Sequence, residues 1–296
     1  AVGYDNIDIE AASARGIAVT NTPGVLTETT ADVAWARLLS GARRVPEADR
    51  FIRSGDWQGW GPLQMLGVEV TGQTLGVVGA GRIGSAMARK SAGFTMNAVY
   101  HGRHERKKLE EELGARRMEL EDLLKTSDFV SLHVPLTDET HHLIGREELK
   151  LMKETAVLIN TSRGPVVDEE ALVQALKAGE IFGAGLDVYE DEPALTPGLA
   201  ELNNVVLTPH IGSATGRTRG KMAEIAAKSL LTVLEGGAAR KLRQSRGVQM
   251  IPSRRVVAVH PYLHPNPDQA LFCGLGQTEK SSVRPNPFFS SGASAA

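Results

Sequence analysis

One short stretch of the sequence joins a strand pattern, a glycine turn and a helix pattern. The apolar run Leu75–Val78 passes directly into Gly79-Ala80-Gly81-Arg82-Ile83-Gly84, and a helix-like segment follows. In such a strand–turn–helix the first glycine permits a tight turn, the second lets a pyrophosphate approach the backbone, and the third lets helix and strand pack closely. The amides and the positive dipole end of the helix then face the phosphates. We therefore predict cofactor contacts at Gly79, Gly81, Arg82, Ile83 and Gly84; the alternative is a glycine-rich turn without a ligand.

Beyond this turn, strand-like and helix-like segments alternate regularly. The strand-like runs are 74–79, 95–100, 127–133, 155–160, 181–186 and 204–207, and helical stretches lie near 82–93, 105–113, 119–125, 146–153 and 168–178. Alternation of this kind favours a parallel sheet covered on both faces, with right-handed crossovers. Six strands match the doubly wound dinucleotide-binding (Rossmann) fold. We predict an α/β dinucleotide-binding domain over residues 25–212.

The chain before this domain contains a helix-like piece, Ile7–Ala14, and a strand-like piece, Gly16–Thr20. A single strand does not form a stable sheet. This strand therefore either joins the sheet of the next domain or ends a domain whose beginning is missing, and we assign residues 1–24 to the remnant of a second domain.

A long linking helix is predicted over 27–45, after Pro23-Gly24. Thr27 or Thr29 can cap it, and its apolar residues follow the i, i+3, i+4, i+7 pattern: Trp35, Leu38, Leu39 and Ala42. This stripe is either core or a dimer surface. Residues 46–66 are predicted to form a loop, which is rich in aromatic residues at 56–62.

Composition excludes several classes of protein. A length of 296 residues with 42% hydrophobic content can bury the cores of two domains, and the net charge of −2, without a basic stripe, does not favour nucleic-acid binding. No apolar run approaches the length of a membrane span and no signal pattern is present, so we predict a cytoplasmic protein that does not bind membranes. The one cysteine, Cys273, excludes an internal disulfide framework and a cysteine-based zinc site.

The end of the chain differs from the rest. A last amphipathic helix is predicted within 213–238, with Met222, Ile225, Ala226, Ser229 and Val233 on one face and a stop at Gly236-Gly237. Residues 239–296 are rich in proline and basic residues and carry no sustained helix or strand period, so we predict an irregular tail.

Ligands of this fold lie beyond the carboxyl ends of the strands. Three side chains with suitable chemistry follow strands there: Arg163, Glu192 and His210. Each alone is more simply a surface ion pair, a solvated acid or a core histidine. Together they predict a catalytic site on the rim that holds the reactive end of the cofactor.

An ordered set of motifs carries a resemblance to a known family. The segments are Val2-Gly3-Tyr4-Asp5-Asn6-Ile7-Asp8, the glycine turn, Asn160-Thr161-Ser162-Arg163-Gly164, Gly185-Leu186-Asp187-Val188, Glu192-Pro193 and Pro209-His210-Ile211-Gly212-Ser213-Ala214. From residue 1 to about 238 the chain resembles the D-2-hydroxyacid dehydrogenases. Within them, Tyr100-His101-Gly102-Arg103 and Trp57-x-x-Trp60-x-Pro62 resemble the glyoxylate/hydroxypyruvate reductase branch.

The resemblance implies roles for these residues in reducing a small 2-oxo acid. His210 would donate the proton, Glu192 would hold its ring, and Arg163 would bind the substrate carboxylate and polarise the keto oxygen. Backbone amides of Val2 and Gly3 would contact the same carboxylate. Cofactor contacts are expected at Pro135, Thr140, Thr161, Ser162, Asp187 and Gly212, with Asp187 at the nicotinamide carboxamide. A homodimer and a flavodoxin-like substrate domain, here incomplete, are further implications.

Cofactor choice follows from the residues at the end of the second strand. NAD sites place an acid there, whereas this chain has Arg103 and no acid between Ser85 and His104. A cation suits a 2′-phosphate, so we predict a preference for NADP(H), with NAD(H) as a possible second cofactor. The alternative is a solvated arginine in a basic loop.

The remaining histidines do not predict a metal site. His141 and His142 are adjacent and are expected to point to different sides. His260 and His264 have an i, i+4 spacing but fall in the proline-rich tail, where a helix is not expected. We therefore predict no metal.

Three functions remain open from the sequence. The first is a reductase of small 2-oxo acids, and the second is a non-catalytic NAD(P) sensor like the corepressors of the same broad family. The third is an inactive fragment, because family members begin several dozen residues earlier and the substrate cleft would have one complete wall. On that ground we expect weak activity unless the missing segment is supplied.

Overall fold

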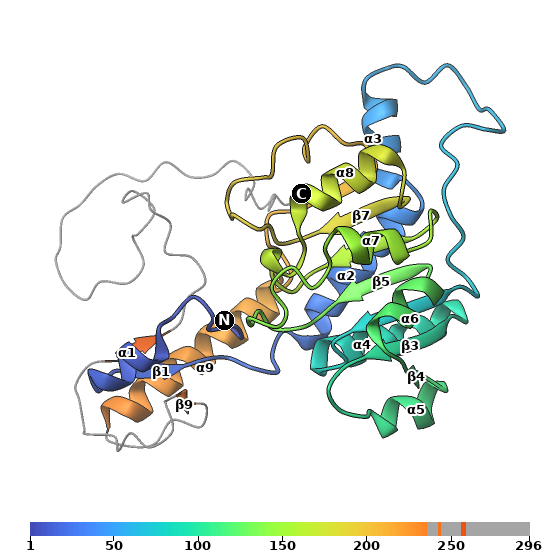
Figure 1. Ribbon diagram of the computed structural model, residues 1–296. Helices are drawn as coiled ribbons and strands as arrows, with labels where there is room; N and C mark the ends of the chain where they lie inside the picture. The colour runs from blue at the N-terminus through green and yellow to red at the C-terminus, as the bar shows by residue number, and fades with distance from the viewer. Residues whose placement is uncertain (236–241, 244–255, 259–296) are drawn as a thin grey trace, which may run out of the picture. The chain divides into compact units, whose positions relative to one another are not determined.

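The computed structural model describes residues 1–235, 242–243 and 256–258 of this chain (Figure 1). Cys273, His260 and His264, and most of the predicted irregular tail, lie outside these residues. Among the described helices, none combines the length and the apolar character that are needed to cross a bilayer.

A seven-stranded parallel sheet forms the centre of the larger part of the fold. Its strands are β2 (Thr74–Val78), β3 (Asn97–His101), β4 (Arg116–Arg117), β5 (Phe129–Leu132), β6 (Val157–Asn160), β7 (Gly183–Leu186) and β8 (Val205–Leu207). Their spatial order is β4-β3-β2-β5-β6-β7-β8, so the strand order reverses between β2 and β5. The six predicted strands are confirmed. The edge strand β4 was not predicted, because two residues are too few to show a period.

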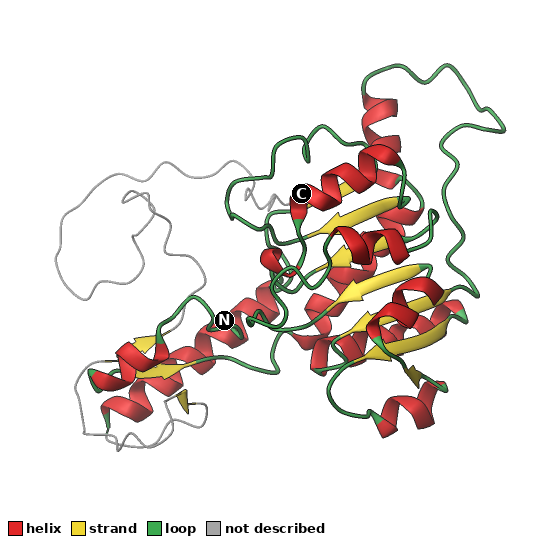
Figure 2. Ribbon diagram, in the orientation of Figure 1, coloured by secondary structure: helices red, strands yellow, loops and turns green. Residues whose placement is uncertain are grey.

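Helices cover both faces of this sheet (Figure 2). They are α4 (Arg82–Lys90), continued by a 3₁₀ turn (Ser91–Phe94), α5 (Lys107–Leu113), α6 (Leu120–Thr126), α7 (Arg146–Leu151) and α8 (Glu169–Ala178). Successive strand residues face opposite sides, so Val77 joins the core under α2 and α4, whereas Val78 joins the core under α6, α7 and α8. The predicted doubly wound α/β fold is therefore confirmed.

The linking helix α2 spans Thr27–Ala42, three residues shorter than predicted. The predicted threonine cap is wrong: Leu26 is the N-cap residue and forms no side-chain capping hydrogen bond. The apolar stripe is core rather than surface at Leu38 and Trp35, which are 0% and 6% exposed. Trp35 stacks on Phe94 with ring centroids 5.0 Å apart, and its indole nitrogen donates to the Met87 carbonyl at 3.0 Å.

The segment predicted as a loop begins with a helix, α3 (Val45–Arg53). Pro46 lies in its first turn, where the missing amide costs no hydrogen bond, and Arg44 turns the chain in the left-handed region at φ 54°. The rest of 46–66 is irregular, as expected, and exposes Trp57 and Trp60.

The N-terminal residues form their own small assembly with the last described helix. α1 (Ile9–Ala14) precedes β1 (Ala18–Thr20), which pairs with β10 (Val256–Ala258) in parallel and with β9 (Leu242–Arg243) in antiparallel orientation. α9 (Gly216–Leu234) contacts β1 and β10, and the residues of its predicted apolar face are less exposed than their neighbours. β1 therefore does not extend the large sheet. The two short strands also correct the prediction that residues 239–296 contain none.

Candidate active site

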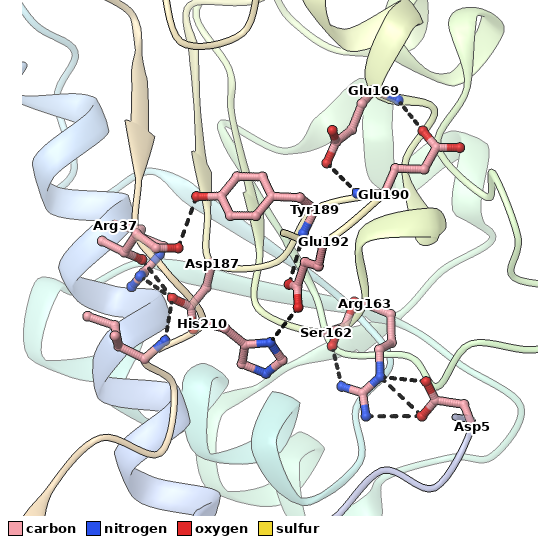
Figure 3. Close-up of polar contacts among 12 residues, drawn as sticks. Asp5, Arg37, Ser162, Arg163, Glu169, Asp187, Tyr189, Glu190, Glu192 and His210 are labelled. Atoms are coloured by element: carbon pink, nitrogen blue, oxygen red, sulfur yellow. Dashed lines mark hydrogen bonds and ion pairs between the residues drawn. The ribbon is translucent and has the colours of Figure 1, made fainter. Parts of the chain in front are cut away.

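Two of the predicted catalytic residues form a pair at the carboxyl end of the sheet. His210 follows β8 and Glu192 lies on the loop after β7; the imidazole Nδ1 is 3.1 Å from Glu192 Oε2 (Figure 3). The other oxygen, Oε1, accepts the Tyr189 amide at 3.1 Å, which fixes the carboxylate from within its own loop. His210 has φ 49°, a conformation that a non-glycine residue adopts rarely and that is often found at functional sites.

Arg163 lies on the same rim and binds Asp5 of the N-terminal segment (Figure 3). Its Nε donates to the Asp5 carboxylate oxygens at 3.1 and 2.9 Å and its Nη2 donates at 3.0 Å, while Nη1 donates to the Ser162 carbonyl at 2.7 Å. Asp5 thus takes the Nε/Nη2 edge of the guanidinium. A second carboxylate can be bound by the Nη1/Nη2 edge, because that fork matches carboxylate geometry.

Gly3 lies against the guanidinium of Arg163. A Cβ at this position would be 1.5 Å from Arg163 Nη2, so only glycine leaves room for the side chain. The preceding carbonyls are tied down, because Val2 accepts from the Asn21 amide at 2.8 Å and Ala1 accepts from the Thr22 amide at 2.7 Å. The structure therefore brings the predicted substrate-binding residues Val2, Gly3 and Arg163 together.

The contact with Arg163 also shifts the pKa of Asp5. Burial raises the pKa of its carboxyl, but the hydrogen bonds and charge of Arg163 outweigh burial, so the pKa is lowered overall. Sequence reasoning quoted Asp5 within a motif but gave it no role. A pairing across 158 residues leaves no local signal.

Asp187 is buried at the end of β7 and forms an ion pair with Arg37 of α2 at 2.6 Å. Its Oδ1 also accepts the Thr208 hydroxyl at 2.6 Å and the Ile211 amide at 2.9 Å. Burial lowers the pKa of Arg37, and the charge of Asp187 acts against that shift. Arg37 was not predicted as part of the site. Its position between the core residues Trp35 and Leu38 could have indicated a buried charge that needs a partner.

Tyr189 closes the same network. Its hydroxyl donates to the Thr208 carbonyl at 2.9 Å, and burial raises its pKa to about 12. Arg37 of α2 and Thr208 after β8 therefore both hold the end of the strand that carries Asp187. A ligand bound there would contact side chains whose positions are fixed.

The glycine turn has the shape of a phosphate cradle. Gly79 has φ 94°, and a Cβ on it would lie 2.8 Å from the His133 backbone; a Cβ on Gly84 would lie 2.3 Å from the Gly79 carbonyl oxygen. Gly81 is exposed, has no described atom within 4 Å of a Cβ position, and caps α4 without a side-chain hydrogen bond. The space beside Gly81 is open, and no described side chain caps the backbone amides of Arg82 and Ile83. Such an arrangement suits the pyrophosphate of a dinucleotide.

The other predicted cofactor contacts lie on the loops that follow β3, β5, β6 and β8. Arg103 is exposed just after β3. Thr140 donates its hydroxyl to the Pro135 carbonyl at 2.6 Å, and the Ser162 hydroxyl donates to Asn160 at 2.7 Å. Thr161 Oγ1 is buried without a hydrogen-bond partner among the described residues. Gly212 is buried beside Asp187, and its carbonyl accepts from Thr30 at 3.1 Å.

The adjacent histidines differ from the prediction. His142 has φ 49°, and this left-handed turn places its ring beside that of His141 with centroids 4.1 Å apart. The expectation that the two rings point to different sides is wrong, because alternation holds only for extended backbone.

Known proteins with similar sequences and structures are numerous. Residues 35–212 match the family model described as "D-isomer specific 2-hydroxyacid dehydrogenase, NAD binding domain". The chain is 59% identical to a glyoxylate reductase of Thermococcus litoralis and 58% identical to one of Korarchaeum cryptofilum, in each case over 80% of this chain and 72% of the relative.

Two solved structures extend the comparison. A protein of Thermus thermophilus superposes with a TM-score of 0.76 at 52% identity, over 82% of this chain and 76% of that one. An NADPH-dependent glyoxylate/hydroxypyruvate reductase of Sinorhizobium meliloti, in complex with NADP and malonate, gives 0.75 at 40% identity over 82% and 75%. The family model, the sequence relatives and the solved structures all indicate the family that the ordered motifs resemble. The chain belongs to the D-isomer specific 2-hydroxyacid dehydrogenase family.

Proposed function

We propose that this chain is an NAD(P)H-dependent reductase of small 2-oxo acids, glyoxylate or hydroxypyruvate first, which forms the 2-hydroxy acid. The observation that carries the proposal is the convergence of the His210–Glu192 pair and Arg163 on one rim of a sheet with a phosphate cradle at its switch point. The names of the relatives support the same reaction.

A bound nicotinamide would supply the hydride for the carbonyl carbon. His210 would deliver a proton to the carbonyl oxygen from Nε2, because Nδ1 faces Glu192. Glu192 would hold the ring in the tautomer and orientation that this transfer needs, and its negative charge would stabilise the imidazolium before transfer. The hydride and the proton together convert the 2-oxo acid into the 2-hydroxy acid.

Arg163 would orient the substrate. Its Nη1/Nη2 edge would bind the carboxylate bidentately while Asp5 holds the other edge. The amides of Val2 and Gly3 would contribute from the opposite side. Asp187, fixed by Arg37, would accept a hydrogen bond from the nicotinamide carboxamide.

Arg103 supports a preference for NADP(H). It stands at the end of β3, where NAD sites carry an acid, and it is exposed to a ligand. Titration of the chain with both reduced cofactors tests this: NADPH is expected to bind more tightly, and Arg103→Ser is expected to remove the difference. Equal or tighter binding of NADH by the unchanged chain contradicts the assignment.

A homodimer is the proposed assembly, formed in the cytoplasm. Large apolar side chains are exposed along α3 and the following loop, and they would be covered by a second copy: Val45, Ile52, Trp57, Trp60, Leu63 and Leu66. Sedimentation of the full chain measures the state, and Trp60→Asp is expected to shift it towards monomer.

The activity is tested by following NADPH absorbance after adding glyoxylate. The reductase loses absorbance, and His210→Asn stops that loss without loss of cofactor binding. A corepressor-like sensor binds NADPH without turnover, and an inactive fragment binds no cofactor, so the same experiment separates all three functions.

A further inference from the structure

A second imidazole–carboxylate group lies on the rim, outside the residues assigned to catalysis. His142 Nε2 is 2.5 Å from Glu190 Oε1, and His141 lies beside His142. One potential ligand atom from each of the three residues lies within 4.8 Å of the other two. Two imidazoles and a carboxylate are a ligand set typical of zinc sites with three protein ligands.

Glu190 is held in place from behind. Its Oε2 accepts the Glu169 amide at 3.2 Å, and its own amide donates to Glu169 Oε1 at 2.9 Å (Figure 3). Glu169 is 1% exposed, and its second oxygen accepts the Thr196 hydroxyl at 2.7 Å. This support leaves Glu190 Oε1 facing His142, which is how an outer shell orients a metal-binding carboxylate.

The backbone of the two histidines is fixed as well. The His142 amide donates to the Pro165 carbonyl at 2.8 Å, and the His141 amide donates to the Thr137 carbonyl at 2.9 Å. These bonds hold His142 at φ 49°, where a histidine is uncommon. This one dihedral angle brings the rings of His141 and His142 to the same side. The backbone conformation therefore places both imidazoles next to Glu190.

We propose that His141, His142 and Glu190 form a binding site for a divalent transition metal ion, with zinc as the ion that suits the ligands best. Zinc–nitrogen and zinc–oxygen distances of roughly 2.0–2.2 Å imply ligand atoms about 3.3 Å apart in a tetrahedral site. His142 and Glu190 would separate slightly, and the exposed ring of His141 would rotate inwards. Solvent exposure leaves the fourth position to water.

The proposal does not depend on the reductase activity, and its test needs neither substrate nor cofactor. Zn²⁺ is titrated calorimetrically into the full metal-free chain, and Co²⁺ binding is followed by its visible absorption. We expect one ion per chain, and the Co²⁺ bands of a four-coordinate site. His141→Gln, His142→Gln and Glu190→Gln are each expected to raise the Kd at least roughly tenfold.

Matched variants separate this site from other ligands. His104→Gln removes an exposed histidine elsewhere, and His210→Asn breaks the His210–Glu192 pair. His260→Gln/His264→Gln/Cys273→Ser removes the histidines and the cysteine that lie beyond the described residues. All three are expected to keep the affinity. Equal melting temperatures without metal show that the variants fold, and Glu190→Gln keeps an oxygen to accept the Glu169 amide.

Absence of stoichiometric binding overturns the proposal. So does binding that survives both His142→Gln and Glu190→Gln, or binding lost in any of the three control variants, because the ion would then lie elsewhere.

Discussion

The rim carries two histidine–glutamate pairs that are alike in sequence and differ in surroundings. Glu190 and Glu192 come from one loop, and both of their partners, His142 and His210, have φ 49°. The exposed fractions of the side chains are also similar, 37% and 23% in one pair and 31% and 31% in the other. The neighbours differ: His210 lies on the rim with Arg163, whereas His142 lies beside a second imidazole. We infer that the third group, rather than the pair, decides whether such a site suits acid catalysis or metal binding.

A third histidine shows what the carboxylate contributes. His133 follows β5, its ring is bonded to the Ser131 hydroxyl at 2.9 Å, and no acid of the described residues is bonded to it. Burial lowers its pKa to about 3, so it stays neutral at physiological pH. A nearby carboxylate favours the protonated imidazole. His142 and His210 each have such a carboxylate partner, in Glu190 and Glu192.

The largest expected effect is the loss of the proposed catalytic pair, His210 and Glu192. His210→Asn removes the proposed proton donor and is expected to lower kcat by about 10³, within the range for general acid catalysis. His142→Asn, the matched change in the other pair, is expected to alter kcat less than about twofold, because His142 has no part in the proposed proton transfer. Steady-state kinetics with glyoxylate measures both. A similar loss in the two variants would mean that the pairs are not distinct.

The next largest effect is expected at Arg163, the residue that lies near the His210–Glu192 pair and has no counterpart, among the described residues, at the His142–Glu190 pair. Arg163→Lys keeps the charge but loses the fork, so kcat/KM is expected to fall by about 10². Cofactor affinity, measured by NADPH fluorescence, is expected to be unchanged. An unchanged kcat/KM would remove Arg163 from substrate binding.

The contrast with His133 predicts a pH dependence of stability. The pKa of His133 is lowered from 6.5 to about 3 in the fold, so the unfolded state binds more protons between these values. The free energy of unfolding should therefore fall as pH drops below 6.5, by up to about 1.4 kcal/mol per pH unit from this residue. His133→Gln is expected to flatten that slope in urea titrations between pH 6.5 and 4.5. An unchanged slope would show that another group is responsible.

The smallest effect is expected at the contact that supports Arg163. Asp5→Asn is expected to reduce stability at pH 7 by about 1 kcal/mol, because the pair is partly exposed. The pKa of Asp5 is lowered in the fold, so this contribution is complete above the ordinary pKa of 3.8 and is lost as pH falls through the folded value. The difference in melting temperature between the two proteins should thus be constant from pH 7 to 5 and shrink below 4. A difference that stays constant at pH 3 would contradict the charge pairing.

Much of the fold followed from local patterns in the sequence. Gly79, Gly81 and Gly84 mark a turn whose geometry only glycine permits, and apolar runs between helical segments identify buried strands. Helix α3 was missed because its exposed apolar residues give no core-facing stripe, although Pro46 marks its start. The two-residue strand β4 and the cap of α2 depend on tertiary packing rather than on local preference.

The residues of the candidate site could be proposed from the sequence, whereas their contacts could not. Arg163, Glu192 and His210 stand out because each follows a strand at the edge where ligands bind. The pairs Arg163–Asp5 and Arg37–Asp187 join positions 158 and 150 residues apart, and no sequence spacing encodes them. The His141–His142 geometry depends on one backbone angle that a histidine adopts rarely.

The shared loop after β7 has a consequence for engineering. Surface connections usually accept inserted or deleted residues at little cost. Here Glu190 and Glu192 are separated by Asp191 alone, and each is anchored by a backbone amide: Glu192 by that of Tyr189, Glu190 by that of Glu169. Changing the length by a single residue would misplace a carboxylate on either side, so redesign of this connection has to proceed by substitution at fixed length.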